Sequence, residues 1–213
     1  NGTSESVYGY KYADQLTSIV IPEGVTKIQT AAFYYCIALE SIDLPSTLET
    51  IESSAFELYV DGNPNELTTK VDFSKCTNLK TVGASAFNGC GGIDEINLPS
   101  TVEYIGARAF SNTNAYKAFF EGLENSKEVK YEIVGDILLW IYMPSSETTL
   151  TVPDGIRIIA GGACSGWDSG IVPTTSEGLR PEWASRYNIS NVVTKVEIPD
   201  SVEVIGDNAF YNM

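Results

Sequence analysis

One short pattern of apolar residues returns along most of this 213-residue chain and constrains its fold more than any other feature. Its clearest copy is residues 39–56, LESIDLPSTLETIESSAF, whose apolar letters are spaced neither as in one helix nor as in one strand. The closing Phe33 of one copy lies 23 residues before Phe56 of the next, and Phe87 lies 23 residues before Phe110. A fixed period of this length is typical of a solenoid, and leucine-rich repeats fall in this range.

Each unit is expected to form one coil made of several short segments. The triplet Ile42-Asp43-Leu44 predicts a short strand that points two side chains inward and one outward, and the Pro that follows ends it. Leu48 and Ile51 would pack inward from the returning limb, and Ala55-Phe56 would close the coil. Because packing accounts for every apolar letter, we expect only the polar letters to be free to act.

The pattern predicts a single domain of about six units, with three stretches in which the period fails. The units lie near residues 16–38, 39–56, 67–92, 93–110, 147–164 and 193–213. The interruptions are residues 57–66, 111–146 and 165–192. Within the second, Gly135-Asp136 separates two apolar runs and predicts a β-hairpin with arms 129–134 and 137–142.

The unit resembles the repeat of BspA-type bacterial leucine-rich repeat proteins, LxxIxLPxxLxxIxxxAFxxC. The resemblance extends over six units, from Leu16 to Phe210, and departs from the pattern at Cys164, which stands where Phe is expected. It implies a β-rich right-handed solenoid with a parallel sheet on its concave face and little helix, interrupted by the hairpin and by a second, irregular insertion. It also implies exported, cell-surface proteins that are often discussed as adhesins, and it supplies no catalytic motif.

Trp167 has a structural interpretation that follows from the departure at Cys164. It lies three residues further along the chain and could fold back to fill the volume of the missing Phe. This hypothesis competes with a role for Trp167 in recognition.

Charge and hydropathy exclude several classes of protein. The chain has 28 acidic and 13 basic residues, a net charge of −15, which argues against binding to nucleic acid or to an anionic membrane surface. It has no run of 18 apolar residues and no signal segment at its start, so no membrane insertion is expected. We expect an extracellular or cell-surface location, with a signal segment already removed.

The cysteines are expected to be buried free thiols. Cys36 and Cys90 occupy the same repeat position two coils apart, which predicts a separation of roughly 10 Å at about 4.8 Å per coil. A disulfide cannot span that distance. The other two cysteines are Cys76 and Cys164.

Catalytic and metal-binding patterns are sparse. The chain contains no His, and it has no phosphate-binding loop or dinucleotide fingerprint, so neither an enzyme nor a cofactor is expected. A weak metal candidate consists of Asp61, Asn63 and Asn65, whose oxygen atoms partly copy a calcium-binding loop. A solvated turn explains these residues better, because the loop's Gly and flanking helices are missing.

Candidate partner-binding residues are aromatic and lie in the interruptions. The outward positions of the predicted sheet are polar and contain no aromatic residue, whereas protein-binding hot spots favour Trp, Tyr and Arg. The candidates are Tyr116, Phe119, Phe120, Trp140, Tyr142, Trp167, Trp183 and Tyr187. The alternative is that these aromatics pack as small satellite cores beneath the insertions.

The sequence therefore predicts a non-catalytic, adhesin-like binding module of a secreted or surface protein, with the repeats as scaffold and the insertions as recognition surface. Its partner would be a protein or a glycan, for example on a host surface or matrix. One alternative is a structural spacer within a larger surface protein, and a lesser one is a carbohydrate-binding module. Because the chain stops at Met213, immediately after the Ala209-Phe210 closure, we also expect further repeats, another domain or a second copy to cover this end.

Overall fold

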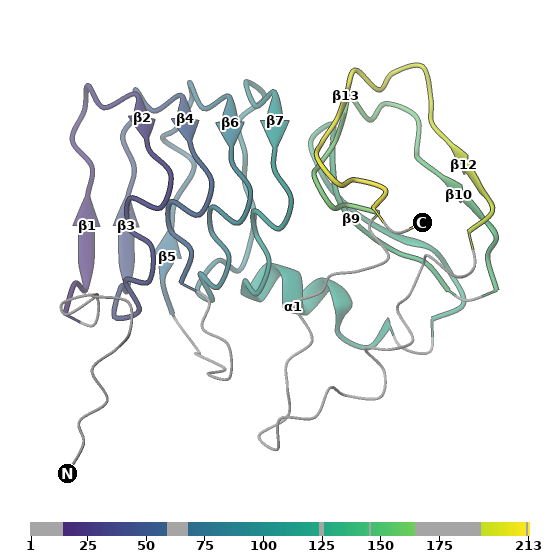
Figure 1. The fold of residues 1–213 in the computed structure, drawn as a ribbon, viewed down its shortest axis with the longest axis horizontal. Coiled ribbons are helices and arrows are strands. Elements are labelled where there is room, and N and C mark those ends of the chain that lie inside the picture. Colours follow the sequence, from purple (N-terminus) through teal and green to yellow (C-terminus); the bar gives the residue numbers. More distant parts are fainter. Residues whose placement is uncertain (1–14, 59–67, 124–125, 145, 165–192, 212) are drawn as a thin grey trace, which may run out of the picture.

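The computed structural model describes residues 15–58, 68–123, 126–144, 146–164, 193–211 and 213. The chain forms two stacks of short coils (Figure 1). The first stack holds the four N-terminal units, and the second holds the hairpin and the last two units. The coils of the first stack are seen from the edge in Figure 1, whereas those of the second stack are seen face-on, so the solenoid turns between the stacks.

One strand ladder arises from the apolar-polar-apolar triplets, as predicted. It comprises the parallel sheet of β1 (Ser18–Val20), β3 (Ser41–Asp43) and β5 (Lys70–Val71), and the parallel pair of β10 (Thr149–Thr151) and β12 (Lys195–Glu197). The register places Ile19 beside Ile42 and Leu150 beside Val196, which stacks equivalent letters. The fourth unit forms no strand at its triplet, although Ile96 there is buried.

A second ladder follows the returning limbs, where the sequence predicts only packing positions. In the first stack it consists of β2 (Lys27–Ile28), β4 (Thr50–Ile51), β6 (Thr81–Val82) and β7 (Tyr104–Ile105). In the second stack it consists of β8 (Lys130–Val134), β9 (Ile137–Tyr142), β11 (Ile158–Ile159) and β13 (Val204–Ile205). The backbone of each returning limb is buried against the same limb of the next coil. Because buried amide groups need hydrogen-bond acceptors, neighbouring limbs pair with each other.

The closing Phe residues form a column through the first stack. The rings of Phe33, Phe56, Phe87 and Phe110 stack in sequence, with centroids 5.1, 5.4 and 5.6 Å apart and planes within 13°. Phe73 contacts the last two edge-on. Offset stacking of this kind adds to the stabilisation from burial, so the column supports the middle of the stack most strongly.

The residue before each Ala-Phe pair, and before Ala163-Cys164 in the fifth unit, adopts a left-handed backbone conformation. Its φ is positive in six units, at Ala31, Ser54, Ser85, Arg108, Gly162 and Asn208. Only one of these six residues is glycine. In the other five coils the closing turn therefore carries a steric cost, because a left-handed backbone brings the Cβ of a residue close to the backbone.

Replacing Ala31 with Gly is expected to raise the free energy of unfolding by about 1 kcal/mol, because Gly relieves the strain at φ 55°. The matched control is Ala32→Gly, an adjacent exposed residue without a positive φ, which should lower stability instead. Urea denaturation of both variants measures the difference. Equal effects of the two substitutions would contradict the assignment of strain to this position.

The predicted hairpin is confirmed, but it is part of the solenoid rather than a projection from it. β8 and β9 pair antiparallel across Gly135-Asp136. β9 also pairs parallel with β11, and the amide of Ile141 donates to the carbonyl of Ala163 at 3.2 Å. In the other coils this last bond links one closing turn to the next, so β9 takes the place of a coil beneath the fifth unit.

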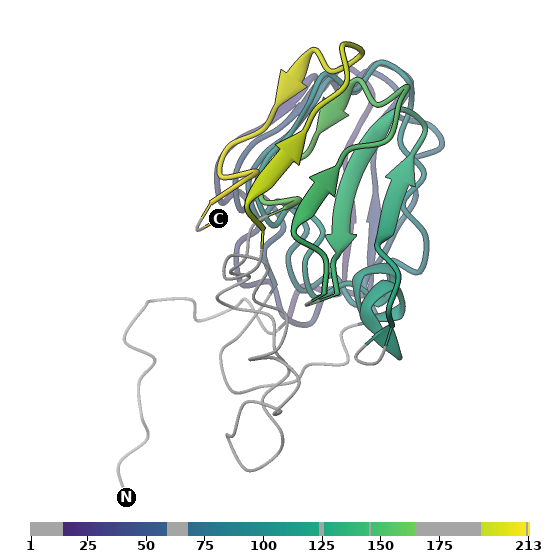
Figure 2. The same cartoon turned by 90° about the vertical axis from the view of Figure 1, so that its right-hand side faces the viewer.

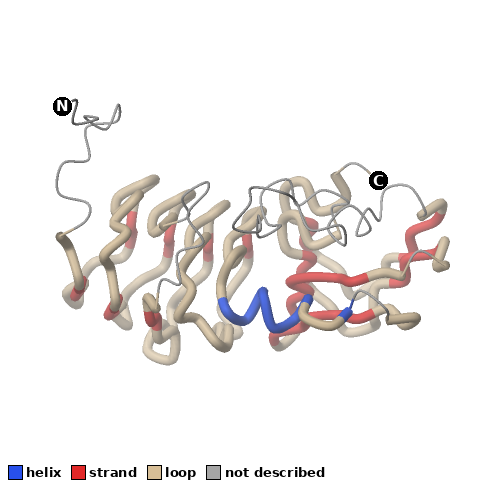
Figure 3. The backbone as a smooth tube through the Cα atoms, turned by 90° about the horizontal axis from the view of Figure 1, so that it is seen from below, coloured by secondary structure: helices blue, strands red, loops and turns tan. Residues whose placement is uncertain are grey.

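A short helix, α1 (Asn114–Phe120), lies between the two stacks and was not predicted individually (Figure 3). Thr113 caps it, because its side-chain oxygen accepts a hydrogen bond from the amide of Tyr116 at 3.1 Å. The amide of Ala115 donates to the carbonyl of Ile93, which ties the helix to the fourth unit. The local cap is a sequence signal for this helix, but seven residues are too few for a clear helical period.

The expectation that the polar letters are free is wrong for the turn after the Pro. The hydroxyl groups of Thr47, Thr101 and Ser201 donate to the carbonyl groups of Val25, Leu79 and Ile156 in the coil beneath. These bonds are 2.8–2.9 Å long. The Ser-Thr letters of the repeat are therefore structural, since they satisfy carbonyl groups that the turn leaves unpaired.

All four cysteines are free, and Cys76, Cys90 and Cys164 are buried, while Cys36 is partly exposed. Burial raises the pKa of Cys76 to about 11 and that of Cys164 to about 12, so both remain protonated thiols at neutral pH. Within the described part of the chain, no helix has the length and hydropathy needed to span a bilayer.

Candidate binding surfaces

The outward face of the first ladder is mostly polar, as predicted from the sequence, although Val20 of β1 is 72% exposed there. Ser41 and Asp43 of β3 are exposed, as are Lys70 and Asp72 in the next unit. Lys75 lies 3.1 Å from Asp43 in an exposed ion pair. Such pairs contribute little because water screens them, so this face offers mainly charge and hydrogen-bonding groups rather than an aromatic anchor.

An aromatic cluster gathers where α1 meets the hairpin. Tyr116 is its base: its ring centroid lies 5.0 Å from that of Trp140 and 4.7 Å from that of Phe120. Phe119 joins the cluster, with centroids 4.7 Å from Phe120 and 5.9 Å from Trp140. Phe119, Phe120 and Trp140 remain half-buried, so part of each ring is accessible to solvent.

Two of the predicted binding residues are largely enclosed. Tyr116 is 9% exposed and Tyr142 is 6% exposed, and the hydroxyl group of Tyr142 donates to the carbonyl of Ser126 at 3.3 Å. Both therefore act mainly in packing. The structure brings Tyr116, Phe120 and Trp140 together, and Phe119 completes the group.

Several sequence candidates lie outside the described residues. They are Trp167, Trp183, Tyr187 and the weak metal candidates Asp61, Asn63 and Asn65. The hypothesis that Trp167 fills the space beside Cys164 also falls there. Within the ranges that the structure describes, no group of three or more acidic or sulfur side chains could hold a metal ion.

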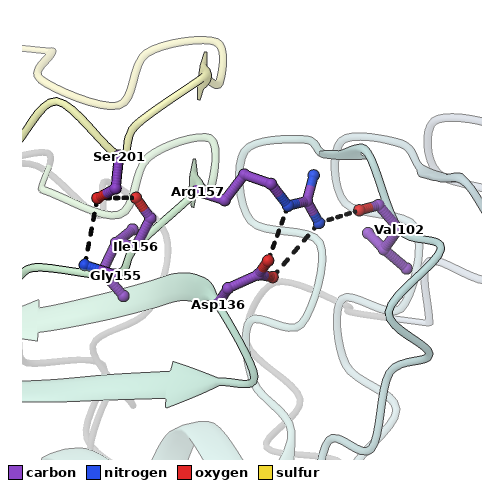
Figure 4. Close-up of polar contacts among 6 residues, drawn as sticks. All are labelled: Val102, Asp136, Gly155, Ile156, Arg157 and Ser201. Carbon is purple, nitrogen blue, oxygen red and sulfur yellow. Dashed lines mark hydrogen bonds and ion pairs between the residues drawn. The ribbon is translucent and has the colours of Figure 1, made fainter.

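A polar clasp joins the two stacks at the hairpin turn (Figure 4). Arg157 of the fifth unit bonds both oxygen atoms of Asp136 in the hairpin turn, at 2.7 and 3.3 Å. The same guanidinium donates to the carbonyl of Val102 in the fourth unit at 2.9 Å. The Asp136 carboxylate raises the pKa of Arg157, and the planar fork of the guanidinium suits this two-sided contact.

A second contact of the joint involves Asp207 of the last unit. Its carboxylate accepts hydrogen bonds from the hydroxyl group of Tyr104 and, at 3.2 Å, from the amide of Ala107. Burial, followed by the bond to Asp207, raises the pKa of Tyr104 to about 12. The protonated phenol is thus favoured in the folded chain, and its contribution to stability is complete below about pH 10 and is lost between pH 10 and 12.

Backbone approach completes the joint. The amide of Gly161 donates to the carbonyl of Ile105 at 2.8 Å, so the fifth unit lies directly against the fourth. A Cβ at Gly161 would come within 3.0 Å of Ala107, Asp207 and Gly106. Only glycine fits this contact, a feature the repeat pattern does not predict.

Comparison with solved structures identifies bacterial leucine-rich repeat proteins. A cell surface protein of Faecalibacterium prausnitzii A2-165 is 21% identical over 93% of this chain and 40% of its own, with a TM-score of 0.36. A leucine-rich repeat protein of T. pallidum is 18% identical over 90% of this chain and 73% of its own, with a TM-score of 0.39. A leucine-rich repeat protein of Eubacterium ventriosum ATCC 27560 is 18% identical over 96% of this chain and 53% of its own, with a TM-score of 0.38.

This chain spans less than half of the F. prausnitzii protein and about half of the E. ventriosum protein. No curated protein matches it. The model of one family, described as the BspA type leucine rich repeat region, matches six copies over residues 4–132 and 185–213. Since this match covers more than half of the sequence, the chain belongs to the BspA-type leucine-rich repeat family.

Proposed function

We propose that this chain is a non-catalytic binding module of a cell-surface or secreted protein, in which the repeats form the scaffold. The membership in the BspA-type family supports a repeat scaffold, and one similar solved structure is itself named a cell surface protein. The recognition surface is the aromatic cluster of Phe119, Phe120 and Trp140.

The half-buried state of this cluster carries the proposal. Tyr116 is buried beneath the three rings and fixes two of them by direct ring contact. Large aromatic rings that are held in place, yet partly open to solvent, make effective anchors because binding costs little side-chain entropy. The first ladder's outward face lacks such anchors.

Polar groups border the aromatic rings. On α1, Asn114 is exposed and donates to the carboxylate of Asp94 at 2.9 Å, and Lys117 is exposed one turn later. Glu121 is exposed just beyond the helix. An apolar centre with a polar rim is the usual arrangement of a protein-binding patch, which favours a protein over a glycan as the partner.

The structural spacer remains the second candidate function. Its support is the enclosure of Tyr116 and Tyr142, because a spacer would bury its insertion aromatics as a satellite core. Accessibility of the remaining rings separates the two functions: recognition requires that they contact a partner.

A binding screen tests the proposal. The chain is presented to immobilised extracellular matrix proteins and to a glycan array, and any interaction is measured again with Phe120→Ala and Trp140→Ala. Each substitution should weaken protein binding by about tenfold or more. The control is Asp43→Ala on the first ladder, which should leave affinity unchanged.

Circular dichroism of each variant shows whether the fold is intact. No binding to either panel supports the spacer. Binding that survives both aromatic substitutions in folded protein places the recognition surface elsewhere and contradicts the proposal.

A further inference from the structure

The face of the hairpin that carries Trp140 also carries a carboxylate. β8 and β9 pair antiparallel with Glu132 directly opposite Trp140. Residues that face each other in this way project from the same side of the sheet, with Cβ atoms about 4.5–5.5 Å apart. In Figure 2, α1 lies at the lower end of these two strands, and its Tyr116 contacts Trp140. Glu132 therefore borders the aromatic cluster on its hairpin side.

The carboxylate of Glu132 lacks a counterion. The side chain is half-buried, and this burial raises its pKa. Among the residues that the structure describes, none forms a hydrogen bond or an ion pair with this carboxylate. Lys130, two positions earlier on the same face of β8, pairs with Glu128 at 2.7 Å instead. Partial burial of an unpaired carboxylate costs free energy, and a cation supplied by a partner would offset this cost.

Aromatic rings beside a carboxylate suit a guanidinium group. A cation is attracted to the face of an aromatic ring when it lies within about 6 Å of the ring centroid, and Trp attracts it most strongly. The guanidinium of Arg is planar, so it can stack on a ring while its N–H groups bond both oxygen atoms of a carboxylate. The ammonium of Lys is more strongly hydrated and loses more on entering a half-buried site.

We propose that the aromatic cluster binds an arginine side chain of a protein partner, with the guanidinium against Trp140 and paired with the carboxylate of Glu132. The inference rests on the proposed function and names the chemistry that the same surface recognises. The rings contact the methylene groups of the arginine, while Glu132 selects its charge. The net charge of −15 attracts cationic partners over a longer range.

NMR titration of the whole chain tests the inference with blocked tripeptides as probes. Acetyl-Gly-Arg-Gly-amide should shift the indole N–H signal of Trp140 and the amide signal of Glu132, and the shifts should saturate. The citrulline analogue replaces the guanidinium with a neutral urea group and should bind at least about fivefold more weakly. Acetyl-Gly-Lys-Gly-amide should also bind more weakly than the arginine peptide, because its ammonium cannot stack and bond both oxygen atoms together.

Glu132→Gln removes the charge and keeps the size of the side chain. This variant should bind the arginine peptide about fivefold more weakly and the citrulline peptide as the wild type does. The matched control is Glu40→Gln, which removes the same charge from an exposed position in the first stack. It should leave the affinity for both peptides unchanged, which shows that net charge alone does not explain the effect.

An arginine peptide that does not shift the Trp140 signal overturns the inference, as does equal affinity of the wild type and Glu132→Gln. A lysine peptide that binds as tightly as the arginine peptide contradicts the assignment to arginine. Failure of the proposed function has a different result. A protein partner whose binding falls with Trp140→Ala but not with Glu132→Gln keeps the recognition surface and removes only the arginine. An arginine peptide that binds while the protein screen finds no partner supports the site and counts against the proposed function.

Discussion

Replacing Phe87 with Ala is expected to lower the free energy of unfolding by about 3–5 kcal/mol. Phe87 is fully buried and stacks on Phe56 and Phe110, while Phe73 meets its ring edge-on. Its loss would leave a cavity in the centre of the column, between the rings of Phe56 and Phe110. The backbone of the coils on both sides would keep this cavity from collapsing. Urea denaturation followed by circular dichroism measures this change.

Phe33→Ala is the matched control, since it removes the same side chain from the same repeat position. Phe33 is only partly buried and stacks on Phe56 alone within the column. The cavity at this end opens toward solvent, so a loss well below that of Phe87→Ala is expected. Equal losses at the two positions would show that the column does not act as a continuous core.

Replacing Gly161 with Ala is expected to separate the two stacks. The added Cβ meets backbone atoms of Ala107 and Gly106, which cannot turn aside as a flexible side chain does. We expect a loss of about 3 kcal/mol, at the upper end of the usual cost of overpacking, because the atoms that the Cβ meets are mostly backbone. Thermal unfolding should then show two transitions, because each stack keeps its own ladders but loses the contact between them.

Gly83→Ala distinguishes steric damage from separation of the stacks. A Cβ at Gly83 meets the backbone of Ser53 just as closely, but this contact lies within the first stack. This variant should lower stability, but its thermal unfolding should remain a single transition. A single transition for Gly161→Ala as well would mean that the clasp of Arg157 suffices to hold the joint.

The repeat frame could be predicted from the sequence because its chemistry is periodic. The apolar residues at Ile42, Ile51 and Phe56 recur at equivalent positions in the other units, so the fold of one coil predicts the fold of the others. The structure confirms the parallel pairing and the stacked core. The hairpin was also predictable, since Gly135-Asp136 between two apolar runs is a local signal.

Features that depend on contacts between distant residues could not be predicted. The joint unites Arg157 with Val102 and Asp207 with Tyr104, pairs that are 55 and 103 residues apart. No local pattern marks such contacts. The role of β9 as a substitute coil is similar, because it depends on pairing with β11 rather than on its own sequence.

The candidate site shows the same division. Composition alone pointed to the insertion aromatics, but it could not say which rings would be enclosed. Tyr116 and Tyr142 are enclosed, while Phe119, Phe120 and Trp140 remain half-buried, and the difference follows from how α1 meets β9. Phe119 belongs with this group through its ring contacts with Phe120 and Trp140.

Native-state hydrogen exchange tests the central claim, that the hairpin and Gly161 join the two stacks into one scaffold. The amide of Gly161 bonds to the carbonyl of Ile105 across the joint. Its exchange should be as slow as that of Phe87, whose amide bonds to Ala109 inside the first stack. Fast exchange of Gly161, while Phe87 stays protected, would show two independent stacks and contradict the claim.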